Sequence, residues 1–262
     1  MRFIRFILHE PQHAFTNMAH DEAISEAVRQ KASPPTLRIY RWDRPSVSIG
    51  YFQKISEIDL DYCKKRDYPV VRRLTGGRAI LHDDELTYSF SSSRDDPLFK
   101  GTLHHDYTLI SKALVEGLRY LGVEAAISFR KKRPADSRSP ACFQSVSFGE
   151  ITVAGKKIIG SAQKRYKDGF LQHGSVMLRS NTEALRNVLR LNGEPPLPAP
   201  GSLQECGTGG ITFDSLASAV KEAFEKELQA RLIIDEPSKI ELRTAQELEK
   251  NKYSNPEWNA LR

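Results

Sequence analysis

Short strand-like segments follow one another closely along this chain, and their succession constrains the fold more than any other feature. Alternating or β-branched runs predict strands at residues 1–10, 37–41, 46–50, 69–73, 79–82, 86–90, 150–153, 157–161, 171–178 and 231–234. Helical periodicity is confined to residues 18–28, 59–66, 104–121, 213–224 and 245–250. Strands in close order favour an α+β protein, with mixed, largely antiparallel sheets and flanking helices, over a doubly wound parallel sheet.

Glycine and proline mark the turns between these segments. The residues Ala154-Gly155-Lys156 predict a hairpin between the strands at 150–153 and 157–161. Gly76-Gly77 predicts a second turn, which would connect the strands at 69–73 and 79–82. Residues 194–210 are rich in proline and glycine, so they are predicted to form a loop.

The length and composition are those of a globular protein with one dominant domain. A chain of 262 residues with 39% hydrophobic residues can bury a large core. The 39 basic and 33 acidic residues give a net charge of +6, which favours acidic partners. The one tight basic run, Arg130-Lys131-Lys132-Arg133, is interpreted as a loop, and without a basic stripe or stacking aromatic residues no nucleic-acid partner is expected.

The chain offers no signal for a membrane, a disulfide or a metal. No apolar run approaches the ~18 residues of a membrane span, so a cytoplasmic location is expected. Cys63, Cys142 and Cys206 form no CxxC pair and are expected to be free thiols. The adjacent pair His104-His105 has no acidic partner at ligand spacing, so no metal site is expected.

Cys142 and Lys157 are candidate catalytic residues, because a thiol and an amine that meet in a fold form an activated nucleophile. A free cysteine with a pKa of ~8.5 is only a few per cent thiolate near neutral pH, and a neighbouring ammonium raises that fraction. The small residues Gly160, Ser161 and Ala162 follow Lys157 and predict a backbone that another group approaches closely. The alternatives are a buried, inert cysteine and an exposed strand lysine.

A second candidate segment contains paired arginines and paired glycines: Arg72-Arg73-Leu74-Thr75-Gly76-Gly77-Arg78-Ala79-Ile80-Leu81-His82. Glycine amides and arginine side chains bind anions, but the segment matches neither a Walker loop nor a GxGxxG fingerprint. An anion-binding loop and a plain tight turn both stay open. His82 and His173 are either general bases or hydrogen-bonded structural residues.

Three segments together resemble the lipoate-protein ligase A and octanoyltransferase family of the biotin/lipoate ligase superfamily. They are the segment 72–82, Gly155-Lys156-Lys157-Ile158-Ile159-Gly160-Ser161-Ala162-Gln163, and Leu171-Gln172-His173-Gly174-Ser175. The resemblance covers nearly the whole chain. It implies one biotin/lipoate-protein ligase catalytic domain over residues 1–262, with a core at about 31–235 and a C-terminal segment, 236–262, packed on it.

Within the family the chain is most similar to the LipM-type octanoyltransferases, which carry a cysteine nucleophile 15 residues before a lysine, as Cys142 and Lys157 stand here. The lipoate ligases usually have a third glycine where this chain has Arg78. The segment Gln144-Ser145-Val146-Ser147 departs from the Pro-Ser sequence common after that cysteine. The resemblance implies that Cys142 forms an acyl thioester and that Lys157 lowers its pKa. The implied substrate-binding residues are Arg72, Arg73, Gly76, Gly77, His82, Gly160, Ser161, Ala162, Gln172, His173 and Gly174.

The implied reaction carries an octanoyl group from octanoyl-acyl carrier protein, through the cysteine, to a lysine of lipoyl-domain proteins such as glycine cleavage H protein or E2 subunits. It needs no cofactor, and the basic run 130–133 is a candidate docking patch for the acidic carrier. Three alternatives stay open: a lipoate-protein ligase that uses ATP and magnesium, a lipoyl-domain amidotransferase, and a lipoyl-domain binding protein without catalysis.

Overall fold

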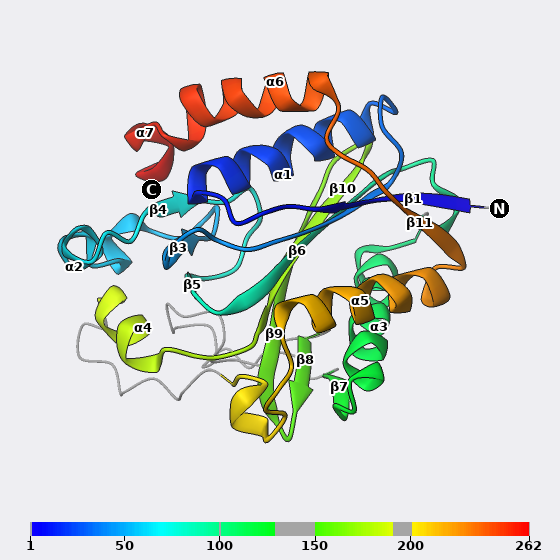
Figure 1. Ribbon diagram of the computed structural model, residues 1–262. Coiled ribbons are helices and arrows are strands. Elements are labelled where there is room, and N and C mark those ends of the chain that lie inside the picture. Colours follow the sequence, from blue (N-terminus) through cyan, green and yellow to red (C-terminus); the bar gives the residue numbers. More distant parts are fainter. Residues whose placement is uncertain (1, 100, 129–149, 191–200, 262) are drawn as a thin grey trace.

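A computed structural model describes residues 2–99, 101–128, 150–190 and 201–261. Its centre is an eight-stranded sheet in the order β11-β1-β2-β6-β10-β9-β8-β7 (Figure 1). The strands are β1 (Arg2–Leu8), β2 (Thr36–Tyr40), β6 (Glu85–Ser93), β7 (Ala125–Ser128), β8 (Glu150–Val153), β9 (Lys156–Arg165), β10 (Gly169–Met177) and β11 (Ala230–Ile234). β1 pairs in parallel with β11 and β2, whereas the other neighbouring pairs are antiparallel, so the predicted fold class is confirmed.

A smaller sheet has the order β4-β3-β5 and consists of β4 (Val70–Arg72), β3 (Ser46–Ile49) and β5 (Ile80–His82). The turn at Gly76-Gly77 connects β4 to β5, but β3 lies between them, so these two strands form no hairpin. The hairpin predicted between β8 and β9 is confirmed. Its turn residues Ala154 and Gly155 have φ of 48° and 76°, as a type I′ turn requires.

One face of the large sheet is apolar and is covered by α3 (Leu103–Tyr120) and α5 (Phe213–Glu227) (Figure 1). Successive residues of a strand point to opposite faces, and in β6 the residues Leu86, Tyr88 and Phe90 point into this core. Ile4, Phe6, Leu37, Ile39, Ile151, Ile159, Phe170 and Val176 extend the same core across the neighbouring strands. The apolar side chains, which alternate with polar ones along each strand, therefore form the main core between the sheet and these two helices.

The opposite face of the sheet is polar, yet it is buried beneath α1 (Ala14–Arg29). Residues directly opposite each other in paired strands share a face, and the register aligns Tyr40 with Thr87 and Thr87 with Ser175. Glu85, Arg38 and His173 share this face with them, and all are less than 9% exposed. Buried polar groups need partners, so this face must hold a hydrogen-bonded network.

The C-terminal segment packs on α1 through α6 (Lys239–Leu248) (Figure 1). Arg5 on β1 binds both carboxylate oxygens of Glu241, at 2.8 and 2.5 Å, and Tyr253 donates to Glu22 at 2.7 Å. The helix predicted at 245–250 was placed too late, because a capping box between Ser238 and Glu241 begins α6 at Lys239.

The remaining helices are short. They are α2 (Leu60–Lys65), α4 (Thr182–Val188), α7 (Pro256–Asn259), η1 (Ile55–Glu57), η2 (Pro97–Phe99), η5 (Gln204–Cys206) and the π-helical turn η6 (Glu249–Tyr253). α4 was not predicted, although Asn181 caps its first turn. In the described part of the chain, no helix is both long and apolar enough to cross a membrane.

Replacing Arg72 by methionine is expected to lower the free energy of unfolding by about 3–5 kcal/mol. The fully buried guanidinium donates to the carbonyl oxygens of Gly50, Gln53 and Asn259, at 2.9, 2.7 and 3.0 Å, and so joins the loop after β3 to α7. Methionine would remove all three of these hydrogen bonds. Urea unfolding measures the effect, and Arg44→Met, at a side chain that is 44% exposed, should cost less than about 1 kcal/mol. Equal losses would contradict this account.

Candidate active site

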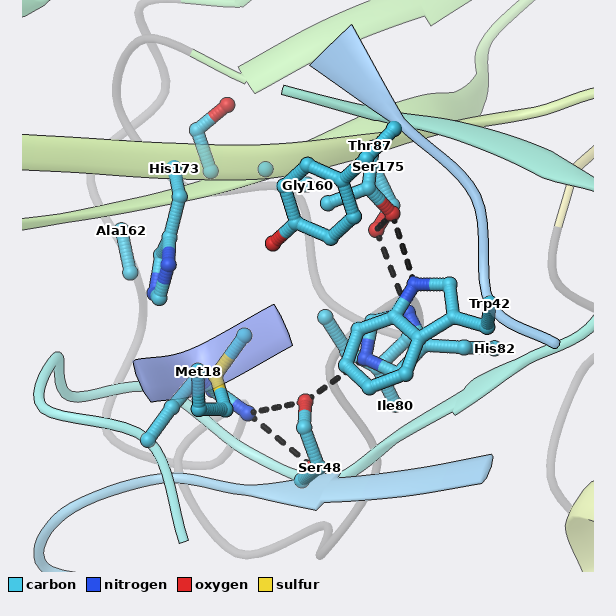
Figure 2. A pocket seen from close by; sticks show the side chains of 14 residues that line it. Met18, Trp42, Ser48, Ile80, His82, Thr87, Gly160, Ala162, His173 and Ser175 are labelled. Carbon is cyan, nitrogen blue, oxygen red and sulfur yellow. Dashed lines mark hydrogen bonds between the residues drawn. The ribbon is translucent and has the colours of Figure 1, made fainter. Parts of the chain in front are cut away.

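A cavity opens between α1, the small sheet and the polar face of the large sheet (Figure 2). Its empty volume is about 350 Å³, a figure that includes space open to solvent. The wall is formed by Met18, Tyr40, Trp42, Ser48, Arg73, Ile80, His82, Thr87, Gly160, Ser161, Ala162, His173, Gly174 and Ser175. Several of these side chains are apolar or very small, so the cavity suits an apolar chain that ends in a polar group.

The structure brings seven of the predicted substrate-binding residues into this wall: Arg73, His82, Gly160, Ser161, Ala162, His173 and Gly174. Gly174 permits a close backbone approach, because a Cβ atom there would lie 2.5 Å from the carbonyl oxygen of Gly160. The other predicted residues, Arg72, Gly76, Gly77 and Gln172, do not line the cavity. Gln172 points to the opposite face, where it donates to the hydroxyl of Tyr88 at 3.0 Å.

Asp21 on α1 organises one side of the cavity. Its carboxylate accepts from Arg38 at 2.8 Å, from the Tyr40 hydroxyl at 2.9 Å and from Nδ1 of His173 at 3.0 Å. Burial alone would raise the pKa of Asp21, but the hydrogen bond from His173 and the charge of Arg38 outweigh it and lower the pKa to about 2. Asp21 is therefore ionised at neutral pH.

His173 is held as a neutral imidazole in the cavity wall. Burial lowers its pKa, although Asp21 acts in the opposite direction. Since the Asp21 carboxylate can only accept, Nδ1 carries the proton, and Nε2 accepts from the hydroxyl of Thr75 at 2.6 Å. Both ring nitrogens are therefore engaged within the protein, which favours the structural alternative for this histidine.

His82 lies on the other side of the cavity, stacked on Trp42 with 3.9 Å between the ring centroids (Figure 2). Its Nδ1 is 2.6 Å from Oε1 of Glu85 and its Nε2 is 2.7 Å from Oγ of Ser48. Thr87 donates to the same oxygen of Glu85 and accepts from Nε1 of Trp42 at 2.9 Å. The polar wall is thus a connected chain of hydrogen bonds.

The loop between β4 and β5 is held by Arg73. Its guanidinium donates to the carbonyl oxygens of Gly76 and Arg78, at 2.9 and 2.8 Å, and to Oγ of Ser48 at 3.1 Å. Gly77 has φ of 93°, and its carbonyl oxygen would lie 2.0 Å from a Cβ atom at Gly50. The paired glycines therefore allow tight packing, and Arg73 is the arginine of the pair that reaches the cavity.

Lys157 is buried on the cavity face of the sheet. Lys157 lies opposite Thr152 in the β8–β9 pair. Ile151 points into the core, so the adjacent Thr152, and Lys157 opposite it, point to the other face of the sheet. Lys157 donates from Nζ to Oε1 of Glu150 at 2.5 Å, and its side chain is 1% exposed. Lys157 is therefore not the exposed lysine of the alternative interpretation. Cys142 lies outside the described residues, as does the run 130–133, so the pairing of Cys142 with Lys157 stays a prediction.

Sequence reasoning assigned no role to several side chains of this site. Asp21, Tyr40, Ser48, Glu85 and Thr87 hold or line the cavity. A usable signal was the strand 85–91, in which polar and apolar residues alternate. That pattern normally indicates a solvent-exposed polar face, so the burial of this one was unexpected. The described residues contain no group of three or more His, Cys, Asp or Glu side chains that could hold a metal ion.

Solved structures share this fold over nearly the whole chain. The crystal structure of a lipoate-protein ligase A bound with ATP is 28% identical, with a TM-score of 0.82 over 99% of each chain. A lipoate protein ligase from Thermoplasma acidophilum, solved in a study of an archaeal lipoylation system with its E2 lipoyl domain, is 28% identical, with a TM-score of 0.81 over 100% of this chain and 98% of that one. The fold is thus that of a catalytic domain of the lipoate-ligase type.

Sequence comparison gives the family. The model of the lipoyl protein ligase A/B catalytic domain matches residues 13–225, and the chain belongs to this family. A relative from Kyrpidia tusciae, named octanoyltransferase LipM, is 41% identical over 256 residues that cover 93% of each chain. The family resemblance drawn from the sequence motifs is confirmed.

Proposed function

We propose that this protein is an acyltransferase that carries an octanoyl group from octanoyl-acyl carrier protein, through a thioester on Cys142, to a lysine of a lipoyl domain. The observation that carries the proposal is the position of Lys157, a buried amine on the same sheet face as the cavity. The name of the Kyrpidia tusciae relative supports octanoyl as the group transferred. The archaeal ligase studied with its E2 lipoyl domain supports a lipoyl domain as the acceptor.

The proposed reaction has two steps. The Cys142 thiolate attacks the thioester carbonyl of the carrier, a new C–S bond forms, and the carrier's sulfur leaves as a thiolate that takes up a proton. The amine of the acceptor lysine then attacks the octanoyl-enzyme, an amide bond forms, and the Cys142 thiolate is released. Each step starts from a thioester, so the proposed reaction uses neither ATP nor another cofactor.

The described residues suit both steps. A positive charge at Lys157 would hold Cys142 as its thiolate, the form that attacks. The apolar wall formed by Met18, Trp42 and Ile80 would accept the octanoyl chain, and burial stabilises such a chain by about 0.8 kcal/mol per CH₂. The net charge of +6 favours encounter with an acidic carrier. We assign this activity to the cytoplasm, whose reducing conditions keep a nucleophilic thiol free.

Intact-protein mass spectrometry tests the proposal. The protein is mixed with octanoyl-acyl carrier protein in the absence of ATP. Wild type is compared with Cys142→Ala and with the control Cys63→Ala, which removes a buried thiol from the apolar cluster at the three-stranded sheet. An octanoyl adduct that hydroxylamine cleaves is expected on wild type and on Cys63→Ala, and none on Cys142→Ala. Transfer to a lipoyl domain should then follow when that domain is added.

A lipoate-protein ligase is the second candidate, because the structure bound with ATP shares the fold over 99% of the chain. A ligase would form no octanoyl adduct on the protein. Its acyl transfer would need ATP and a free acid, and it would survive Cys142→Ala. That result would replace the proposal. An amidotransferase would instead accept the octanoyl group only from a lipoyl domain, which a change of donor protein distinguishes.

A further inference from the structure

Ser48, His82 and Glu85 form a serine, histidine, carboxylate chain in the cavity wall. Oγ of Ser48 is 2.7 Å from Nε2 of His82, and Nδ1 of His82 is 2.6 Å from Oε1 of Glu85. These distances match those between a hydroxyl, its general base and the group that orients the base. All three residues are buried, and Ser48 and His82 line the cavity (Figure 2).

We propose that this Ser48–His82–Glu85 relay takes up the proton that the ammonium of the acceptor lysine loses before the amine attacks the octanoyl-enzyme. The inference rests on the proposed acyl transfer and adds to it a proton acceptor for the attacking lysine. It assigns a direct role to Ser48, which would touch the amine, and an indirect role to His82 and Glu85.

The donors around Glu85 decide the direction of the hydrogen bonds. Oε1 accepts from Ser175 at 2.8 Å and from Thr87, whose own oxygen already accepts from Trp42. An indole N–H only donates, so the Thr87 proton must point to Glu85. With a carboxylate on that side, Nδ1 of His82 carries a proton, and in the neutral imidazole Nε2 is then the acceptor.

Arg73 decides the direction at Ser48. Its guanidinium donates to Oγ of Ser48 at 3.1 Å, and a guanidinium has no acceptor atom. The hydroxyl proton of Ser48 cannot go to Arg73, so it goes to Nε2 of His82 at 2.7 Å. The serine oxygen is therefore set up to pass its own proton to His82 and to accept another from the cavity.

The proton transfer balances as follows. The ammonium of the acceptor lysine first passes one proton to Ser48 while the serine's own proton moves to His82, and the imidazolium is stabilised by Glu85. The free amine then forms the C–N bond to the thioester carbonyl, and its nitrogen releases a second proton to solvent. The C–S bond breaks with its electron pair on Cys142, and the proton on His82 returns through Ser48 to that thiolate or to solvent.

Single-turnover transfer from a purified octanoyl-enzyme tests this relay. The acceptors are a lipoyl domain, whose lysine is an ammonium at neutral pH, and hydroxylamine, which is neutral there. Ser48→Ala and His82→Gln are compared with wild type after each protein has been converted to its octanoyl-enzyme. Transfer to the lipoyl domain should fall by about 10²-fold, whereas transfer to hydroxylamine should stay within about threefold.

Two variants serve as controls. Ser46→Ala removes a buried hydroxyl from the same strand, one that donates to the carbonyl of Arg44 and does not line the cavity, so every step should keep the wild-type rate. Ser48→Thr keeps a hydroxyl and should restore most of the transfer to the lipoyl domain.

Equal losses with both acceptors would overturn the relay, because they would mean that Ser48 and His82 only shape the wall. Unchanged transfer to the lipoyl domain would overturn it as well, while the thioester function would stand. Failure of the wild-type protein to form an octanoyl-enzyme would instead overturn the proposed function, and the relay with it.

Discussion

Lys157→Met is expected to lower the rate of octanoyl transfer by about 20- to 50-fold. Without the ammonium, Cys142 would return to a thiol that is only a few per cent ionised near neutral pH. The rate at which the adduct forms on mixing with octanoyl-acyl carrier protein measures the loss. Lys156→Met is the matched control, because that neighbouring side chain is 52% exposed and should leave the rate unchanged.

The same substitution also breaks a buried ion pair, so its effect on stability must be separated from its effect on chemistry. Removing one partner of such a pair costs about 3–5 kcal/mol, whereas replacing both by apolar residues is often neutral. The double variant Lys157→Met/Glu150→Leu should therefore regain most of the free energy of unfolding, measured in urea, and none of the activity. If the double variant regained activity, Lys157 would have only a structural role.

Asp21→Asn is expected to lower the free energy of unfolding by about 3–5 kcal/mol. The substitution leaves the guanidinium of Arg38, which is 0% exposed, without a counter-charge, and it weakens the hydrogen bonds to Tyr40 and His173. Urea unfolding at neutral pH measures the change. Asp168→Asn is the control: its side chain is 46% exposed beside Arg29 and should contribute less than about 1 kcal/mol.

The contribution of Asp21 to stability should depend on pH in a defined direction. Its folded-state pKa of about 2 lies below the value of about 3.9 in an unfolded chain, so the unfolded state binds the proton more tightly. The contribution, about 2–3 kcal/mol, is complete above pH ~4 and is lost as the pH falls towards 2. The difference between wild type and Asp21→Asn should shrink over that range, and a constant difference would contradict this assignment.

The elements and the family were predictable from local pattern. The helix expected at 104–121 is observed as Leu103–Tyr120, and the hairpin at Ala154-Gly155 follows from two residues that tolerate positive φ. The helices at 182–188 and 239–248 were missed or misplaced because their signals are local caps and not long apolar stripes. Asn181 caps the first of them, and the capping box of Ser238 and Glu241 begins the second. Motif order was sufficient to indicate the catalytic domain, because it depends only on residue identity along the chain.

The site was predictable only in part. The sequence by itself determined that Leu86, Tyr88 and Phe90 share one face of a strand, since side chains alternate with a period of two. Only the tertiary structure decided that the polar face opposite them is buried, because α1 covers it. It also brought Asp21 to His173 across 152 residues, and Ser48 to His82 across 34. Such contacts depend on strand order and register, which long-range pairing sets and local pattern does not encode.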